Sequence, residues 1–138
     1  MPNILVVEDD FANADLLRLM LETEGHRVAT ALTGPAALEV ARNEPFDLVV
    51  LDFNLGPPID GFEVASRLRA GGFSGPIICQ TGSTSQVDRE RCLGAGVSVV
   101  LLKPFRRKEI LALVGRLLSE ARQALDGPDD ARDEAVGP

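Results

Sequence analysis

The sequence predicts an α/β protein with a doubly wound, five-stranded parallel sheet covered by helices on both faces. Five short apolar runs rich in β-branched residues alternate along the chain with segments whose apolar residues recur at helical spacing. The runs are apolar almost throughout, which is typical of strands that helices cover on both faces. Glycine and proline residues fall between the segments. This strict alternation favours parallel strands joined by right-handed crossovers.

The five expected strands are short apolar runs that end in polar residues or turns. Each is too short for an ordinary helix and is bounded by turn-forming or charged residues. They cover Ile4 to Val7, Val28 to Leu32, Leu48 to Leu51, Ile77 to Cys79 and Val97 to Leu102.

Each strand leads into a segment with apolar residues three and four positions apart, the spacing of one helix face. The anchors are Leu16, Leu17, Met20 and Leu21 in the first segment, Ala36, Ala37, Val40 and Ala41 in the second, Phe62, Ala65 and Leu68 in the third, and Ile110, Leu113, Val114 and Leu117 in the fifth. The fourth segment, Thr84 to Leu93, has few apolar anchors, so we expect its helix to pack most loosely.

Length and composition limit the protein to one globular domain. The chain has 138 residues, 45% of them hydrophobic and 25% charged, which is enough for a single core. We expect residues 1–121 to form the domain and residues 122–138 to form an acidic, disordered tail with few large apolar side chains. Cys79 and Cys92 lack metal-ligand spacing and are expected to be buried or idle thiols.

Charge and hydropathy exclude several classes of function. The net charge of -7 argues against direct binding to nucleic acid or to an anionic membrane, because both favour a basic surface. The apolar runs are far shorter than the roughly 20 residues of a membrane span, and the N-terminus lacks the pattern of a signal peptide. The sequence therefore predicts a cytoplasmic protein without membrane insertion.

Polar residues cluster where four of the strands end. Because the carboxyl ends of parallel strands share one edge of the sheet, ligands bind there. The residues are Glu8, Asp9 and Asp10 after the first strand, Asp52 after the third, Thr81 after the fourth and Lys103 after the fifth. Two carboxylates 4 Å apart repel by about 4 kcal/mol at an effective dielectric near 20, so a cation is expected among them. Mg²⁺ suits carboxylates combined with phosphate oxygens and water.

These residues lie in motifs that resemble the signature of the two-component response-regulator receiver family. The motifs are Val6-Val7-Glu8-Asp9-Asp10, Leu51-Asp52-Phe53-Asn54-Leu55, Asp60-Gly61, Thr81-Gly82 and Lys103-Pro104-Phe105. The resemblance covers about residues 2 to 120. It implies a flavodoxin-like, CheY-like (βα)5 fold with strand order 2-1-3-4-5.

The resemblance also implies a role for each acidic residue of the cluster. Asp52 would be the phosphoacceptor, which forms an aspartyl phosphate. Glu8 and Asp9 would form an acidic pair, with Asp9 as a direct Mg²⁺ ligand. Asp52 and the backbone carbonyl of Asn54 would complete the protein ligands of Mg²⁺. Taken alone, Asp9 is explained equally well as a helix cap.

The resemblance assigns the phosphoryl oxygens to Thr81 and Lys103, and it implies a cis peptide bond between Lys103 and Pro104. The resemblance therefore implies a signalling switch and not an enzyme that acts on other substrates. The added phosphoryl charge of about -1.5 to -2 would draw Thr81 and its loop inward. Such a switch takes its phosphoryl group from a sensor histidine kinase or a histidine phosphotransfer protein. We expect a stand-alone, single-domain type that either binds a downstream protein target or relays its phosphoryl group to a histidine phosphotransfer partner.

The sequence departs from the family pattern beside the expected site. The loop from Asn54 to Gly61 is one residue longer than usual, and Val100 stands where many relatives carry an aromatic residue. A homodimer through the fourth helix, fifth strand and fifth helix stays open, as does a seam formed by Leu111 and Leu118. His26 opens the second strand at the opposite edge and is expected to have a structural role.

Two other functions compete with a phosphorylated switch. A haloacid-dehalogenase-like phosphatase would need a second acid two residues after the nucleophile, where this chain has Asn54. A pseudo-receiver would use the same fold to bind a partner without phosphorylation. Intact residues at Asp9, Asp52, Thr81 and Lys103 argue against it.

Overall fold

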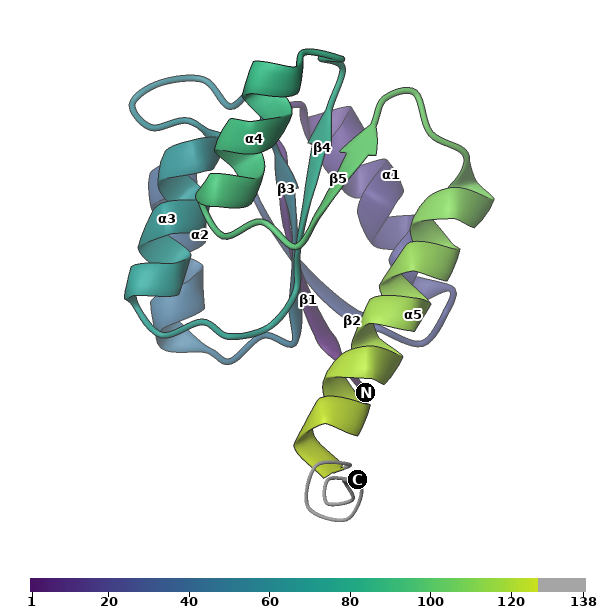
Figure 1. The fold of residues 1–138 in the computed structure, drawn as a ribbon. Helices are drawn as coiled ribbons and strands as arrows, with labels where there is room; N and C mark the ends of the chain where they lie inside the picture. Colours follow the sequence, from purple (N-terminus) through teal and green to yellow (C-terminus); the bar gives the residue numbers. More distant parts are fainter. Residues whose placement is uncertain (127–138) are drawn as a thin grey trace, which may run out of the picture.

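The structure, a computed structural model, describes residues 1–126, which form one parallel sheet between two layers of helices (Figure 1). The strands are β1 (Asn3–Val7), β2 (Arg27–Ala31), β3 (Leu48–Asp52), β4 (Ile77–Thr81) and β5 (Val99–Leu102). All neighbouring strands pair in parallel, in the order β2-β1-β3-β4-β5. The expected fold class and strand order are confirmed.

Five helices alternate with the strands and cover both faces of the sheet. They are α1 (Phe11–Glu22), α2 (Gly34–Asn43), α3 (Gly61–Ala70), α4 (Gln86–Gly94) and α5 (Arg107–Asp126). Helices α1 and α5 lie on one face, whereas α2, α3 and α4 lie on the other (Figure 1). No helix in the described part of the chain is long and apolar enough to cross a membrane.

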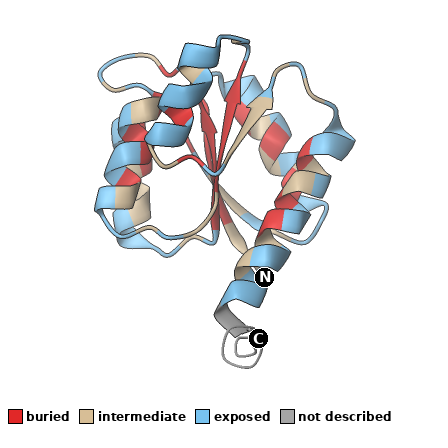
Figure 2. Cartoon of the chain, in the orientation of Figure 1, coloured by how far each residue is buried: buried red, intermediate tan, exposed pale blue. Residues whose placement is uncertain are grey.

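The sheet divides the apolar interior into two cores. Strand residues alternate between faces, so Leu5 and Val7 pack beneath α2, α3 and α4, whereas Ile4 and Val6 pack beneath α1 and α5. Strands β3 and β4 are buried along their whole length (Figure 2). Burial on both faces explains why these runs are apolar throughout.

Side-chain caps fix where four of the helices begin. Asp10, Thr33, Asp60 and Ser85 each accept a hydrogen bond from the backbone amide three residues later. Asp10 therefore has the structural role of capping α1, with its carboxylate bonded to Asn13 N.

Helix α4 has a single buried residue, Cys92, whereas each of the other helices has at least two. The expectation that this helix packs most loosely is therefore confirmed. Its buried residue contacts β4, where Cys92 Sγ lies 3.5 Å from Cys79 Sγ. Both thiols are free and buried, and burial raises the pKa of each. The sequence spacing gave no sign that these two thiols touch.

Several expected boundaries were wrong by a few residues. Strand β5 begins at Val99 and not at Val97, because Gly96 makes a turn with a φ of 101° before the ladder starts. Helix α5 runs past residue 121, the expected end of the domain, to Asp126, since residues 122–126 include neither glycine nor proline. The tail expected from sequence otherwise falls on residues 127–138, outside the described residues.

Three other residues considered in the sequence, His26, Leu111 and Leu118, lie outside the polar cluster. His26 lies just before β2 at the amino edge, half-buried, and burial lowers the pKa of its imidazole. Leu111 and Leu118 are partly buried and pack against the core beneath α1 and α5. These two leucines therefore contribute to packing within the domain.

Candidate functional site

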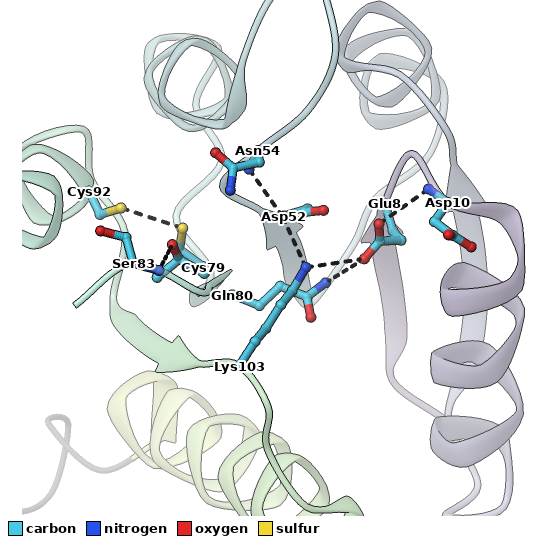
Figure 3. Close-up of polar contacts among 10 residues, drawn as sticks. Glu8, Asp10, Asp52, Asn54, Cys79, Gln80, Ser83, Cys92 and Lys103 are labelled. Carbon is cyan, nitrogen blue, oxygen red and sulfur yellow. Dashed lines mark hydrogen bonds and ion pairs between the residues drawn. The ribbon is translucent and has the colours of Figure 1, made fainter. Parts of the chain in front are cut away.

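Four polar side chains form a row across the carboxyl end of the sheet, on the face that α1 and α5 cover. Residues two apart in a strand share a face, so each member follows an apolar column of the core. Asp52 follows Val50 within β3, and Gln80 follows Ile78 within β4. Glu8 and Lys103 lie directly after β1 and β5, two residues beyond Val6 and Leu101. Figure 3 shows these four side chains meeting in one place.

Lys103 is the positive charge of this row. Its Nζ lies 3.4 Å from Asp52 Oδ1 and 3.9 Å from Glu8 Oε1, so one ammonium bridges two carboxylates. Both carboxylates are almost fully buried, whereas the Lys103 side chain is 35% exposed. The ammonium offsets part of the repulsion between two acids that would otherwise face each other in a medium of low dielectric.

Glu8 is a buried acid whose two oxygens have separate partners. Asp10 N donates a hydrogen bond to Oε2 at 3.2 Å, and Gln80 Nε2 donates to Oε1 at 3.3 Å. Burial raises the pKa of Glu8 to about 7; the Asp10 amide opposes this rise and the Asp52 carboxylate adds to it. Without a further cation, a sizeable share of Glu8 is protonated at neutral pH.

The acidic residues come close enough to share a cation. Glu8, Asp9 and Asp52 each offer an oxygen, and these oxygens lie within 4.8 Å of one another. Asp9 is exposed and lies at the outer side of the group, with Glu8 and Asp52 buried. Hard oxygen donors of this kind suit Mg²⁺, which keeps several waters. The residues therefore fit the divalent ion expected from the sequence.

Asp52 ends β3, and the chain beyond it folds back against its carboxylate. Asn54 N donates a hydrogen bond to Asp52 Oδ1 at 3.1 Å, which places the Asn54 main chain beside the acid. Gly61 allows the start of α3 to approach, because a Cβ there would lie 2.6 Å from the Asp52 carbonyl oxygen. The Asp60-Gly61 motif thus combines a helix cap with a residue small enough for this contact.

Thr81 is the buried last residue of β4 and bonds within its own loop. Its hydroxyl oxygen accepts a hydrogen bond from Ser83 N at 3.0 Å, and Ser83 Oγ donates to Asp88 of α4 at 2.8 Å. Among the described residues, no hydrogen bond joins Thr81 to Asp52. The Lys103-Pro104 bond is cis, as expected; the Pro57-Pro58 bond is also cis, which the sequence reasoning did not include.

Gln80 is the member of the row that sequence reasoning missed. It is 2% exposed and is the register partner of Asp52 across the β3–β4 ladder. The sequence does contain a signal: a glutamine stands between the apolar run Ile77-Ile78-Cys79 and Thr81. A buried amide needs a partner, and the acids at the same edge supply it.

Glu8→Gln is expected to stabilise the metal-free protein at pH 8 by on the order of 2 kcal/mol. A folded-state pKa of about 7, raised from 4.5, means that the fold favours the protonated acid. Its contribution to stability is full below pH 4.5 and is lost as the pH rises through 7. Glutamine imitates the protonated acid, so the two proteins should differ little at pH 4.

Urea unfolding of both proteins at pH 4 and pH 8, in the presence of a chelator, measures this difference. Glu44→Gln, at an exposed position, is the matched control and should leave stability nearly unchanged at both values. Equal stability of the wild type and Glu8→Gln at pH 8 would contradict the raised pKa.

Comparison with known proteins gives one consistent family. The model of the response regulator receiver domain matches residues 4–115. The alkaline phosphatase synthesis transcriptional regulatory protein PhoP of Bacillus subtilis is 36% identical over 134 residues, covering 97% of this chain and 55% of that protein. The cell cycle response regulator CtrA of Brucella ovis is 31% identical, covering 86% and 51%. The chain thus spans about half the length of these curated relatives.

Solved structures agree with the sequence relatives. A CheY-like receiver domain protein from Methanospirillum hungatei has a TM-score of 0.85 and 29% identity, covering 90% of this chain and 98% of that one. The receiver domain of a sensor histidine kinase from Pseudomonas aeruginosa has a TM-score of 0.78 and 34% identity, covering 86% and 98%. That structure is described with a magnesium ion coordinated in its active site cleft.

Proposed function

The chain belongs to the response regulator receiver family of two-component systems, and we propose that it is a switch controlled by phosphorylation of Asp52. The observation that carries the proposal is the environment of the Asp52 carboxylate. It is 3% exposed, lies within the acidic group and is paired with Lys103 at the carboxyl edge of the sheet. An isolated surface aspartate would have none of these features.

The two oxygens of Asp52 differ in a way that supports this role. Oδ1 lies 3.4 Å from Lys103 Nζ and accepts the hydrogen bond from Asn54 N. Within residues 1–126, both N–H donors to this carboxylate bond to Oδ1 and none bonds to Oδ2. Oδ2 is therefore the oxygen we assign to the attack on phosphorus: its new bond to phosphorus forms while the bond from phosphorus to the donor's leaving atom breaks.

We assign Mg²⁺ to Glu8, Asp9, Asp52 and the backbone carbonyl of Asn54. When bound there, Mg²⁺ would neutralise charge on the phosphoryl oxygens. Asp9, as the exposed member, is the residue that we expect to bind it directly. The magnesium described for the related receiver domain supports this assignment.

Lys103 and Thr81 are proposed to bind the phosphoryl oxygens once Asp52 is phosphorylated. Phosphorylation places negative oxygens beside the Lys103 ammonium, which is already within 3.4 Å of Asp52. A hydrogen bond from the Thr81 hydroxyl to a phosphoryl oxygen would pull on Ser83 N, and through Ser83 Oγ on Asp88 of α4. Helix α4 buries one residue, so it is the element that such a pull would displace most easily.

The partners follow from this role and are likewise proposals. A sensor histidine kinase or a histidine phosphotransfer protein would donate the phosphoryl group. A downstream protein target would bind the face formed by α4, β5 and α5, which the displacement of α4 would change. Helix α4 exposes the apolar side chains Val87 and Leu93, and β5 exposes Leu102. A homodimer through the same face is the alternative. The stand-alone organisation expected from the sequence stays a prediction.

Intact mass after incubation with a small phosphodonor tests the function. With Mg²⁺ we expect the mass of one phosphoryl group to be added, and with a chelator in place of Mg²⁺ we expect no gain. Circular dichroism checks that the chelated protein stays folded. A folded protein that gains no mass with several donors would contradict the proposal and favour a binding module that works without phosphorylation.

A further inference from the structure

We propose that Gln80 is a positioning residue, which holds Glu8 in the orientation that the metal site needs. The inference rests on the Mg²⁺ site of the proposed function. Gln80 is a buried neutral amide, 2% exposed, at the end of a strand whose preceding residues are apolar. Its Nε2 donates to Glu8 Oε1 at 3.3 Å (Figure 3). The two residues are 72 positions apart in the chain.

Gln80 is the one side chain whose N–H donates a hydrogen bond to Glu8 within the described residues. Lys103 Nζ is 3.9 Å from Glu8 Oε1, beyond hydrogen-bond distance, and lies closer to Asp52. The remaining donor to Glu8 is the Asp10 backbone amide, which bonds to Oε2. The amide of Gln80 and the backbone of Asp10 therefore hold one oxygen each and together fix the plane of the carboxylate.

The position of Gln80 explains how it reaches Glu8. Gln80 is in register with Asp52, and β3 lies between β4 and β1 in the sheet. Its side chain shares the face of Asp52 and extends past it toward β1. Because Gln80 is 2% exposed, it contacts Glu8 from within the domain, whereas Asp9 of the same acid group is exposed to solvent.

A neutral amide suits this position better than a second cation. A lysine or arginine there would orient Glu8 but would also neutralise it and compete with the metal. The Gln80 amide donates a hydrogen bond without adding charge, so the acid group keeps its attraction for a divalent ion. Partners that orient metal ligands in this way typically contribute about 10- to 100-fold to metal affinity.

The test is the dissociation constant of Mg²⁺ for the wild type and for Gln80→Met, measured by calorimetric titration. The chain has no tryptophan or tyrosine whose fluorescence could report binding. Methionine has a similar length and no hydrogen-bond donor, so we expect it to weaken binding by about 10-fold or more. Gln80→Asn keeps the amide on a shorter side chain and should weaken binding similarly.

Gln86→Met is the matched control, because Gln86 Nε2 also donates to a carboxylate, that of Glu90, on the exposed side of α4. It should bind Mg²⁺ as the wild type does. Metal-free thermal unfolding separates positioning from folding: weakened Mg²⁺ binding with an unchanged melting temperature supports positioning. If Gln80→Met binds Mg²⁺ within twofold of the wild-type affinity, the role of Gln80 is wrong but the metal site stands. If the wild type binds no Mg²⁺, both the metal site and the role of Gln80 are wrong.

Discussion

Asp52→Asn is expected to abolish phosphoryl incorporation completely. The amide has nearly the shape of the carboxylate, so the hydrogen bond from Asn54 N and the strand end at β3 can persist. It lacks the anionic oxygen that attacks phosphorus. Intact mass after incubation with phosphodonor and Mg²⁺ should show one added phosphoryl group in the wild type and none in the variant.

Asp15→Asn provides the control for this substitution. Asp15 pairs with Arg18 on the surface of α1, so its loss changes the same kind of group outside the row. This variant should gain the phosphoryl mass as the wild type does. Incorporation into Asp52→Asn at the wild-type level would show that another residue is the acceptor.

Lys103→Met is expected to lower the free energy of unfolding of the metal-free protein by about 2 kcal/mol at pH 8. Methionine keeps much of the side-chain length, but the two buried carboxylates of Glu8 and Asp52 lose their shared ammonium. The full cost of an unpaired buried charge is larger, and the partial exposure of Lys103 reduces it. At pH 5 the loss should be smaller, because the raised pKa of Glu8 leaves that acid protonated.

Chemical unfolding at the two pH values measures the effect of Lys103→Met. Lys108→Met, at an exposed position in the first turn of α5, is the control and should be close to neutral. A loss of stability that is the same at pH 5 and pH 8 would argue against the bridge between the two acids. Phosphoryl uptake should be reduced but retained, because Asp52 Oδ2 is unchanged.

Some of the site could be predicted because strand ends are visible in the sequence. Apolar runs that stop at Glu8, Asp52, Thr81 and Lys103 place these residues at one edge of any parallel sheet. The structure brings Glu8, Asp9, Asp52 and Lys103 together, in agreement with that reasoning. For Thr81 the structure confirms the position at the edge but shows its hydroxyl bonded to Ser83.

The sequence by itself determined the α/β class, the alternation of five strands with five helices and the acidic carboxyl edge, because these depend on local spacing and on the order of polar and apolar residues. The tertiary structure alone decided that Gln80 bonds to Glu8 and that the two buried thiols touch. Both contacts join residues from different parts of the fold. Gln80 lies in β4 and Glu8 follows β1, and β3 lies between these two strands. Such contacts depend on which strands neighbour each other and which rotamers the packing allows, and neither is written in the local spacing of the chain.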